Sequence, residues 1–169
     1  MKLTAGQWLV HTHYGVGQIL KKEKRSLEGV TRVYYCVKIS EGEYWLAVEN
    51  AHPPRIRRLS SEVELLRARE ILQMPYECLP EDRKERTHYY KERLELNSLD
   101  ELAKLVRDIF GRKLENDLSY AERQHFEGIC QQFVHEWMVV VGISREAAQH
   151  ELRNDFEKIA KQVSISNRN

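Results

Sequence analysis

Histidine is the residue type in this sequence best suited to metal binding or acid–base chemistry, and two of the seven histidines stand close together. His11 and His13 are separated by one residue within a short β-prone segment, so both side chains should point to the same face of the expected strand. A metal site there requires at least one further ligand, and no Asp, Glu or Cys stands at a recognisable ligand spacing. We interpret the pair as hydrogen-bonded residues at a strand end, and the sequence predicts no metal site.

The three cysteines also form no recognisable site. Cys36 and Cys130 fall within apolar patterns and are expected to lie in the core, whereas Cys78 falls in a predicted loop. An odd number of cysteines without a Cys-x-x-Cys spacing is typical of proteins of the reducing cytoplasm and disfavours a disulfide framework. We therefore expect a cytoplasmic protein.

No common catalytic or cofactor-binding motif occurs in the sequence. The Gly-rich dinucleotide and phosphate loops, the Gly-x-Ser-x-Gly nucleophile turn and the His-Glu-x-x-His zinc motif are all missing. The longest apolar run, residues 137–141, is far shorter than the roughly 20 residues that a membrane-spanning helix needs. The sequence thus predicts a protein that is not an enzyme, binds no cofactor or small-molecule substrate, and does not enter a membrane.

Basic and aromatic residues gather near the N-terminus, where residues 1–61 carry ten Lys or Arg and five Asp or Glu. Lys24 and Arg25 follow one predicted strand, and Tyr44 and Trp45 lie in another. Strict alternation places Tyr44 on the core face and Trp45 on the opposite face. An exposed Trp with Arg is typical of a protein interface, and an edge strand can also accept a partner strand. A Trp45 that caps the small core is an equally good interpretation.

Residues 82–96 form a predicted helix with a basic and aromatic outer face. Tyr90 and Leu94 are one turn apart and are expected to face the helical core. The residues assigned to the exposed side are Lys84, Arg86, His88, Tyr89, Lys91 and Arg93. Basic residues interleaved with aromatic ones suit contact with a nucleic-acid backbone and a stacking or wedge contact. Glutamates on the same helix dilute this charge, so from composition alone an ordinary solvated helix is the better interpretation.

The elements that must position these residues change character near residue 60. Before it, hydrophobic residues recur at every second position, with glycines between the runs. The predicted strands are 7–11, 16–21, 30–39, 43–48 and 55–59. So many short strands in about 60 residues predict a small barrel of the SH3 or Tudor type over residues 1–60.

After residue 60 the apolar period becomes helical. Ser61, Ser98 and Ser119 each stand three positions before a Glu, which is the capping-box signature of a helix N-terminus. The predicted helices are 61–74, 81–95, 98–111, 119–141 and 144–163. The predicted fold class is therefore α+β in two domains, a small barrel followed by an all-α bundle of about five helices over residues 61–169.

Several short motifs follow one another in a characteristic order. In the N-terminal half they are Gly-Gln-Trp-Leu-Val at 6–10, His-Thr-His-Tyr-Gly-Val-Gly at 11–17, Tyr-Tyr-Cys-Val-Lys at 34–38, Glu-Asn-Ala at 49–51 and Arg-Arg-Leu at 57–59. In the C-terminal half they are Tyr-Lys-Glu-Arg-Leu at 90–94, the segment 102–109, and Leu-Ser-Tyr-Ala-Glu-Arg at 118–123. Their order and spacing resemble the CarD/CdnL family of bacterial transcription regulators, whose N-terminal module is shared with the polymerase-interacting domain of transcription-repair coupling factor.

This resemblance implies a Tudor-like domain that binds the β subunit of RNA polymerase and a helical domain that touches promoter DNA. Arg25 matches a family contact position, and Lys24, Tyr44 and Trp45 would complete the polymerase-binding surface. In the helical domain, Arg123 joins the residues of helix 82–96 as a DNA contact. Binding to the backbone and minor groove would be weak and non-specific, and the function would be modulation of open-complex stability at initiation.

Two of these positions depart from the family pattern. Trp45 stands where the family often has a basic residue. Arg86 stands where the family has the Trp that is thought to wedge into the minor groove. The missing Trp and the mildly acidic C-terminal third support an alternative, a non-enzymatic protein-interaction adaptor that docks on RNA polymerase without a direct DNA role.

Overall fold

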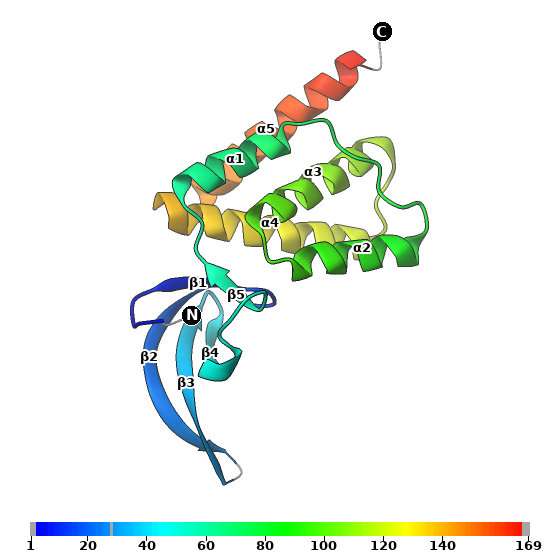
Figure 1. Cartoon of the computed structure of the whole chain (residues 1–169). Helices are drawn as coiled ribbons and strands as arrows, with labels where there is room; N and C mark the ends of the chain where they lie inside the picture. The colour runs from blue at the N-terminus through cyan, green and yellow to red at the C-terminus, as the bar shows by residue number, and fades with distance from the viewer. Residues whose placement is uncertain (1–2, 28, 167–169) are drawn as a thin grey trace. The chain divides into compact units, whose positions relative to one another are not determined.

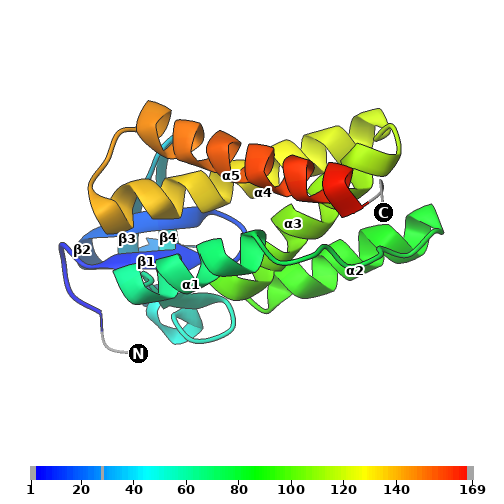
Figure 2. The ribbon, with the colours of Figure 1, turned by 90° about the horizontal axis from the view of Figure 1, so that it is seen from above.

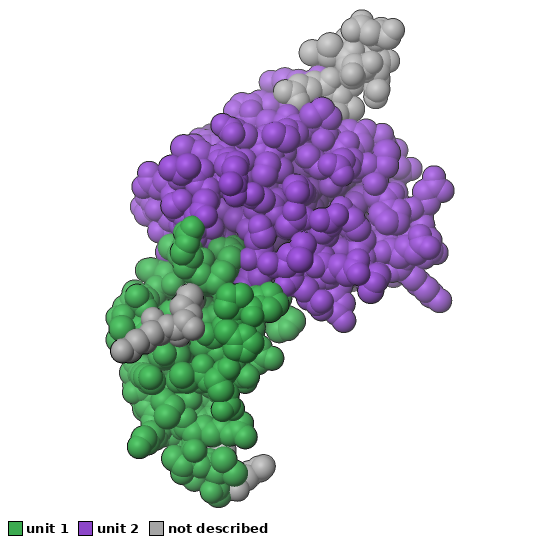
Figure 3. Space-filling view, in the orientation of Figure 1, with its two compact units in different colours: residues 1–59 green, residues 60–169 purple. Residues whose placement is uncertain are grey.

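The computed structural model describes residues 3–27 and 29–166. The chain divides into two compact units, residues 1–59 and residues 60–169 (Figure 3). Each unit has its own hydrophobic core, one built from strand residues and the other from helix residues. The predicted α+β fold class, strands first and helices after, is confirmed.

The N-terminal unit is a five-stranded antiparallel sheet with the order β4-β3-β2-β1-β5 (Figure 1). Its strands are β1 (Trp8–His11), β2 (Gly15–Leu27), β3 (Val30–Ile39), β4 (Gly42–Ala47) and β5 (Ile56–Arg58), with the short 3-10 helix η1 (Val48–Asn50) after β4. β4 and β5 are therefore the edge strands, and each has one side without a strand partner in the described part of the sheet.

The core of this unit follows the alternation of side chains along the strands. Ile19, Tyr35, Val37 and Leu46 are buried together, and Tyr44 packs partly against them. Alternation along β2 is interrupted after Ile19, where the pairing with β3 shifts by one residue at a β-bulge. The bulge decides the face of each basic residue that follows it, because a one-residue shift exchanges the two faces of a strand.

The C-terminal unit is a bundle of five helices. They are α1 (Glu62–Leu72), α2 (Arg83–Glu95), α3 (Leu99–Glu115), α4 (Tyr120–Val141) and α5 (Arg145–Ser166). α3 packs against each of the other four helices and lies between the α1–α2 side and the α4–α5 side of the bundle (Figure 2). Its position explains why α3 is buried around most of its circumference, including Arg107 and Asp108.

Two of the three predicted capping boxes are confirmed. Ser61 with Glu64 and Ser119 with Glu122 each make both reciprocal hydrogen bonds at the start of α1 and α4. The box predicted at Ser98 is wrong, because the Ser98 side chain makes no capping hydrogen bond at the start of α3.

The segment between α1 and α2 is held against α3 by a few specific contacts. The ring of Tyr76 lies over Gly111 so closely that a Cβ at Gly111 would overlap it. The backbone N–H of Glu77 donates to Asp108 Oδ1 at 2.8 Å, and Arg107 donates to the Asp108 carboxylate at 2.7 Å. The start of α2 itself is capped by Asp82, whose side chain accepts hydrogen bonds from the backbone N–H groups of Lys84 and Glu85.

Across the described residues, no helix is both long enough and apolar enough to cross a membrane.

Candidate functional site

Trp45 and Arg25 are brought together on the outer face of the sheet. Lys21 pairs with Cys36 and Cys36 with Trp45, so these three side chains form a row across β2, β3 and β4. The Arg25 guanidinium carbon lies 4.0 Å from the Trp45 ring centroid, and Lys21 Nζ lies 5.5 Å from it. Trp45 is consequently half-buried under cationic side chains and does not join the apolar core, so it does not cap that core.

Lys24 and Tyr44, the other two predicted polymerase contacts, lie on the opposite face of the sheet from Trp45. Lys24 pairs with Val33, next to the pair formed by Arg25 and Arg32, and neighbouring strand residues point to opposite faces. The four predicted contacts therefore lie on two faces of the sheet. Arg25 and Trp45 share the outer face and touch each other, whereas Lys24 and Tyr44 lie on the opposite face.

Tyr44 belongs to a group of rings that the sequence did not predict. Its ring centroid lies 4.4 Å from that of Tyr14 and 5.4 Å from that of His11, the latter in an edge-to-face arrangement. The hydroxyl of Tyr44 is buried and has no hydrogen-bond partner among the described residues. Burial, and secondarily Tyr14, raises the pKa of this hydroxyl above its ordinary value. Tyr44 is thus a neutral phenol with an unused donor.

These rings form part of the wall of a cavity of about 380 Å³ in the N-terminal unit. Four consecutive lining residues, 44–47, belong to the edge strand β4, so the cavity lies alongside that edge. Its wall also includes Tyr14, Tyr34, Arg32, Arg55 and His13, and no Asp or Glu is among the described lining residues. No sequence pattern indicated this cavity, because its wall combines four segments that are distant in the chain. The sequence feature most closely related to it is the alternation along β4, which places Tyr44 and Trp45 on opposite faces of the sheet.

His11 fixes the turn that carries Tyr14 to this cavity. Its Nδ1 accepts hydrogen bonds from the backbone N–H groups of His13 at 3.0 Å and Tyr14 at 3.4 Å. Burial, followed by the charges of His13 and Arg55, lowers the pKa of His11 to about 4, so its ring is neutral and Nδ1 remains an acceptor near neutral pH. The expected pair on one strand face is wrong, because β1 ends at His11 and His13 lies in the turn. The expected hydrogen-bonded role is confirmed for His11.

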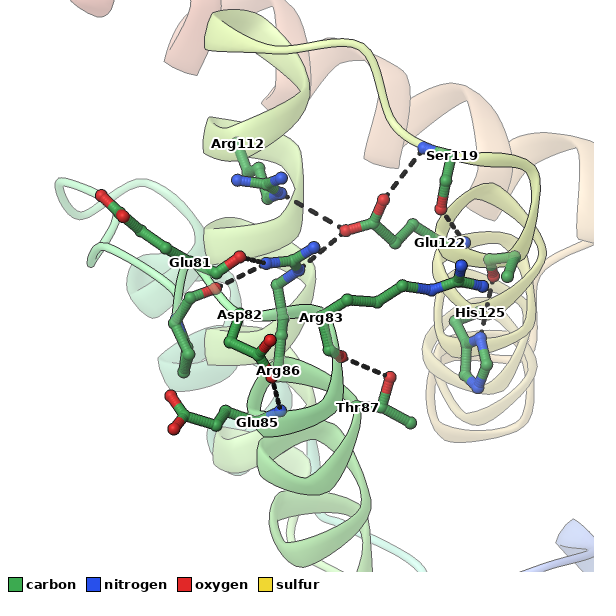
Figure 4. A network of polar contacts seen from close by, with 12 residues as sticks. Glu81, Asp82, Arg83, Glu85, Arg86, Thr87, Arg112, Ser119, Glu122 and His125 are labelled. Atoms are coloured by element: carbon green, nitrogen blue, oxygen red, sulfur yellow. Dashed lines mark hydrogen bonds and ion pairs between the residues drawn. The ribbon is translucent and has the colours of Figure 1, made fainter.

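Arg86, the predicted centre of the exposed ridge on α2, is buried, with 4% of its surface exposed. Its Nε donates to Glu122 Oε1 at 2.7 Å, and its Nη1 donates to the carbonyl oxygens of Pro80 at 2.6 Å and Glu81 at 2.8 Å (Figure 4). The prediction that Arg86 lies on an exposed DNA-contacting face is therefore wrong. The signal was present in the sequence, since Arg86 stands four residues before Tyr90, which was assigned correctly to the core.

Glu122 is the acceptor on which this network converges (Figure 4). Besides Arg86, Arg112 Nε lies 3.4 Å from Glu122 Oε1, and the Ser119 backbone N–H donates to Oε2 at 2.9 Å. Burial by itself would raise the pKa of Glu122, but the hydrogen bonds from Ser119 and Arg86 outweigh it and lower that pKa to about 2. The network joins the start of α2, the end of α3 and the first turn of α4.

The remaining six predicted DNA contacts are exposed or half-buried, and three of them have carboxylate partners. His88 Nε2 lies 3.2 Å from Glu92, Lys91 Nζ lies 4.0 Å from Glu95, and Arg93 Nη1 lies 2.8 Å from Glu101. Arg93 also lies over the ring of Tyr89, with 5.0 Å between its guanidinium carbon and the ring centroid, and both residues are half-buried. Lys84 and Arg123 are exposed, and Arg123 donates to the Leu118 carbonyl oxygen at 2.8 Å.

In the described residues, no group of three or more His, Cys, Asp or Glu side chains is arranged to hold a metal ion. The structure places the three cysteines separately, with Cys36 buried, Cys130 partly buried and Cys78 exposed. Burial raises the pKa of the Cys130 thiol to about 12, so this thiol is not a nucleophile near neutral pH.

Comparison with known protein families matches both units. Residues 3–60 match the CarD-like/TRCF RID domain, which has a Tudor-like fold, and residues 67–153 match the CarD C-terminal domain. The two matches are in the order that the sequence motifs indicate. CarD-like families are non-enzymatic transcription factors. The chain therefore belongs to the CarD/CdnL family and is a transcription-related protein that interacts with RNA polymerase.

Proposed function

We propose that residues 1–60 dock this chain on the β subunit of RNA polymerase and that residues 61–169 act on promoter DNA beside it. The observation that carries the proposal is the contact of Arg25 with Trp45 on the outer face of the sheet next to the edge strand β4. A Trp and Arg pair is typical of the residues that dominate binding energy at interfaces. An edge strand with a free side can also receive a strand from a partner.

We propose further that the chain modulates the stability of the open promoter complex. A protein that binds the open complex more tightly than the closed one shifts the equilibrium by that difference in affinity. The exposed cations Lys84, Lys91 and Arg123, with His88, are the candidate contacts to the DNA backbone. So few phosphate contacts give weak, non-specific binding, and attachment to polymerase supplies the effective concentration that makes such binding sufficient.

The buried state of Arg86 removes the minor-groove contact from this proposal and leaves backbone contact. Arg86 cannot reach DNA without breaking its ion pair with Glu122 and its bonds to two carbonyl oxygens. Tyr89, the one tyrosine among the predicted α2 contacts, is half-buried beneath Arg93. The DNA contribution should therefore depend strongly on salt and little on promoter sequence.

The lifetime of the open complex on polymerase holoenzyme tests this function. Addition of the wild-type chain should change the lifetime, and a variant with Lys91→Ala and Arg123→Ala should reduce the change by severalfold. That variant should also lower the slope of the logarithm of lifetime against the logarithm of salt concentration by about one to two, because each lost phosphate contact contributes about one. A Lys158→Ala variant, which removes a cation from α5, is the matched control.

The adaptor function is the second candidate, favoured by the pairing of His88, Lys91 and Arg93 with glutamates on the proposed DNA side. In that case the helical unit binds another protein. The same experiment separates the two functions: retention of the chain by polymerase, with an open-complex lifetime that does not respond to the chain at any salt concentration, would establish the adaptor and overturn the DNA role.

A further inference from the structure

The end of the β2–β3 hairpin is a two-stranded β-ribbon. β1 pairs with β2 only as far as Gln18, and β4 pairs with β3 only as far as Tyr34. Beyond these positions, residues 24–27 and 30–33 pair with each other and, among the described residues, with no other strand. Figure 1 shows this part of the hairpin extending past the rest of the sheet. No further strand therefore flanks the β-ribbon.

The two faces of this hairpin end differ in charge. Lys22 pairs with the core residue Tyr35, so Lys22 and, two residues further, Lys24 lie on the face that carries the core, which we call the inner face. Both lysines are exposed, and among the described residues neither has a carboxylate within ion-pair distance. On the outer face, by contrast, Lys21 Nζ lies 2.8 Å from the Glu23 carboxylate. The inner face thus offers uncompensated positive charge.

Two hydroxyl groups continue the inner face towards the end of the β-ribbon. Ser26 follows Lys24 by two residues and pairs with Thr31, so both hydroxyls lie on the same face as the lysines. Both residues are exposed. Lysine ammonium groups and the hydroxyls of serine and threonine are among the groups that contact phosphate oxygens of nucleic acids. The described part of the inner face therefore presents hydrogen-bond donors and positive charge without a carboxylate.

The composition of the inner face fits nucleic acid better than protein or lipid. Lys and Ser are depleted at the centre of protein interfaces, which are enriched in aromatic residues and Arg. A surface that enters a membrane needs exposed apolar side chains. The exposed residues described on this face are instead Lys22, Lys24, Ser26 and Thr31. A two-stranded β-ribbon is also narrow enough to enter the major groove of duplex DNA, so both its charge and its width complement DNA.

The lysines of the inner face are more available to an anion than the cations of α2. His88 and Lys91 lie 3.2 Å and 4.0 Å from glutamates of their own helix, whereas the two inner-face lysines have no such partner among the described residues. Lys22 Nζ lies 5.5 Å from the centroid of the Tyr35 ring, so this ring holds the stem of Lys22 while the residue stays exposed. Holding the side chain before binding reduces the conformational entropy that binding costs.

We infer that the inner face of the β2–β3 hairpin end binds the phosphate backbone of duplex DNA, through the ammonium groups of Lys22 and Lys24 and the hydroxyls of Ser26 and Thr31. This contact goes beyond the proposed function, which assigns DNA contact to the helical unit. Phosphate contacts carry no sequence information, so this binding is independent of base sequence and weakens steeply as the salt concentration rises.

Binding of the full chain to a fluorescently labelled duplex of mixed sequence, followed by anisotropy over a range of salt concentrations, tests the inference. Lys22→Gln with Lys24→Gln should weaken binding by roughly tenfold at low salt. It should also lower the slope of the logarithm of affinity against the logarithm of salt concentration by about two, because each lost phosphate contact contributes about one. The matched control is Lys21→Gln with Lys38→Gln, which removes two exposed positive charges from the outer face of the same unit. Thermal unfolding verifies that each variant is folded.

Further variants and ligands decide between charge at this face and other causes. Lys22→Arg with Lys24→Arg keeps both charges and should bind DNA as the wild type does. Equal weakening by the inner-face and outer-face variants would overturn the inference in favour of a general charge effect, as would an inner-face variant that binds DNA like the wild type. Loss of binding to poly-glutamate or to vesicles of anionic phospholipid, with DNA binding unaffected, would overturn it in favour of an acidic protein or a membrane.

The helical-unit variant Lys91→Ala with Arg123→Ala separates this inference from the proposed function. If that variant loses DNA binding while Lys22→Gln with Lys24→Gln retains it, the inference fails and the DNA role of the helical unit stands. If the inner-face variant alone loses DNA binding, the inference stands and the DNA contact of the helical unit fails.

Discussion

Arg86 and Glu122 form a buried ion pair, with 2.7 Å between Arg86 Nε and Glu122 Oε1, that joins the start of α2 to the first turn of α4. Arg86 stands where the family resemblance places a Trp thought to contact DNA, and here the position is used for internal structure. Both oxygens of the carboxylate are occupied, one by Arg86 and the other by the Ser119 backbone N–H. The pair is thus fully hydrogen-bonded, which is the condition under which buried charges are tolerated.

Loss of Arg86 should destabilise the helical unit more than loss of both partners. We expect Arg86→Ala to lower the free energy of unfolding by about 3 kcal/mol, because Glu122 then stays buried without its main counter-charge. The double variant Arg86→Met with Glu122→Met should recover most of that loss, since no uncompensated charge remains. Urea unfolding followed by circular dichroism measures both. A single variant as stable as the wild type would show that the pair contributes little.

The stability of the helical unit should fall at acid pH because of Glu122. The folded-state pKa of Glu122 is about 2, below its ordinary value of 4.5, so the folded form binds fewer protons than the unfolded form between these values. The contribution of Glu122 is therefore fully present above pH 4.5 and is lost as the pH falls from 4.5 towards 2. Unfolding measured from pH 6 to pH 2 should show a smaller acid loss for Glu122→Gln than for the wild type; curves of equal steepness would contradict this.

Two glycine substitutions in the helical unit should have opposite effects. Gly111→Ala should destabilise by about 2 kcal/mol or more, because its Cβ would overlap the Tyr76 ring and displace the segment before α2. Gly128→Ala on α4 is the control: nothing lies near its Cβ, and alanine favours a helix, so it should stabilise by about 0.5 to 1 kcal/mol. The melting temperatures of the two variants compare these effects directly. A Gly111→Ala variant that melts at the wild-type temperature would show that the packing of the Tyr76 ring does not require a glycine at position 111.

The two faces of the sheet should contribute unequally to polymerase binding through the predicted contacts. Trp45→Ala should weaken binding at least tenfold, because the ring supports Arg25 at 4.0 Å on the outer face of the sheet. Lys24→Ala should weaken binding by only a small factor, since Lys24 lies on the other face and does not join that contact. Affinity for purified polymerase distinguishes the two variants. Equal losses would indicate a general charge effect and not a localised surface.

Alternation and capping signals predicted most of the fold because both are local. The alternation at 43–48 correctly separated Leu46 from Trp45, and the boxes at Ser61 and Ser119 correctly located the starts of α1 and α4. At Ser98 the box does not form, and the Glu101 carboxylate is bound instead by Arg93 of α2 and by Lys104. A local pattern cannot reveal such competition between helices.

The binding surfaces were less predictable because their partners are distant in sequence. Arg86 was assigned to the surface by its charge, whereas the carboxylate that permits its burial lies 36 residues further along the chain. The β-bulge after Ile19 determines which basic residues of β2 share a face with Trp45. No pattern of residue types in the sequence predicted this bulge. The cavity beside β4 requires the turn at Tyr14 to fold against Tyr44, which depends on the hydrogen bonds of His11.

The central place of α3 has a consequence for how the helical unit responds to local fluctuation. Because α3 shares an interface with all four neighbours, none of them can detach without exposing part of its apolar surface. The amide protons of α3 should therefore exchange with solvent only through global unfolding of the bundle. α2, which has few buried side chains of its own, should be the first helix to lose protection.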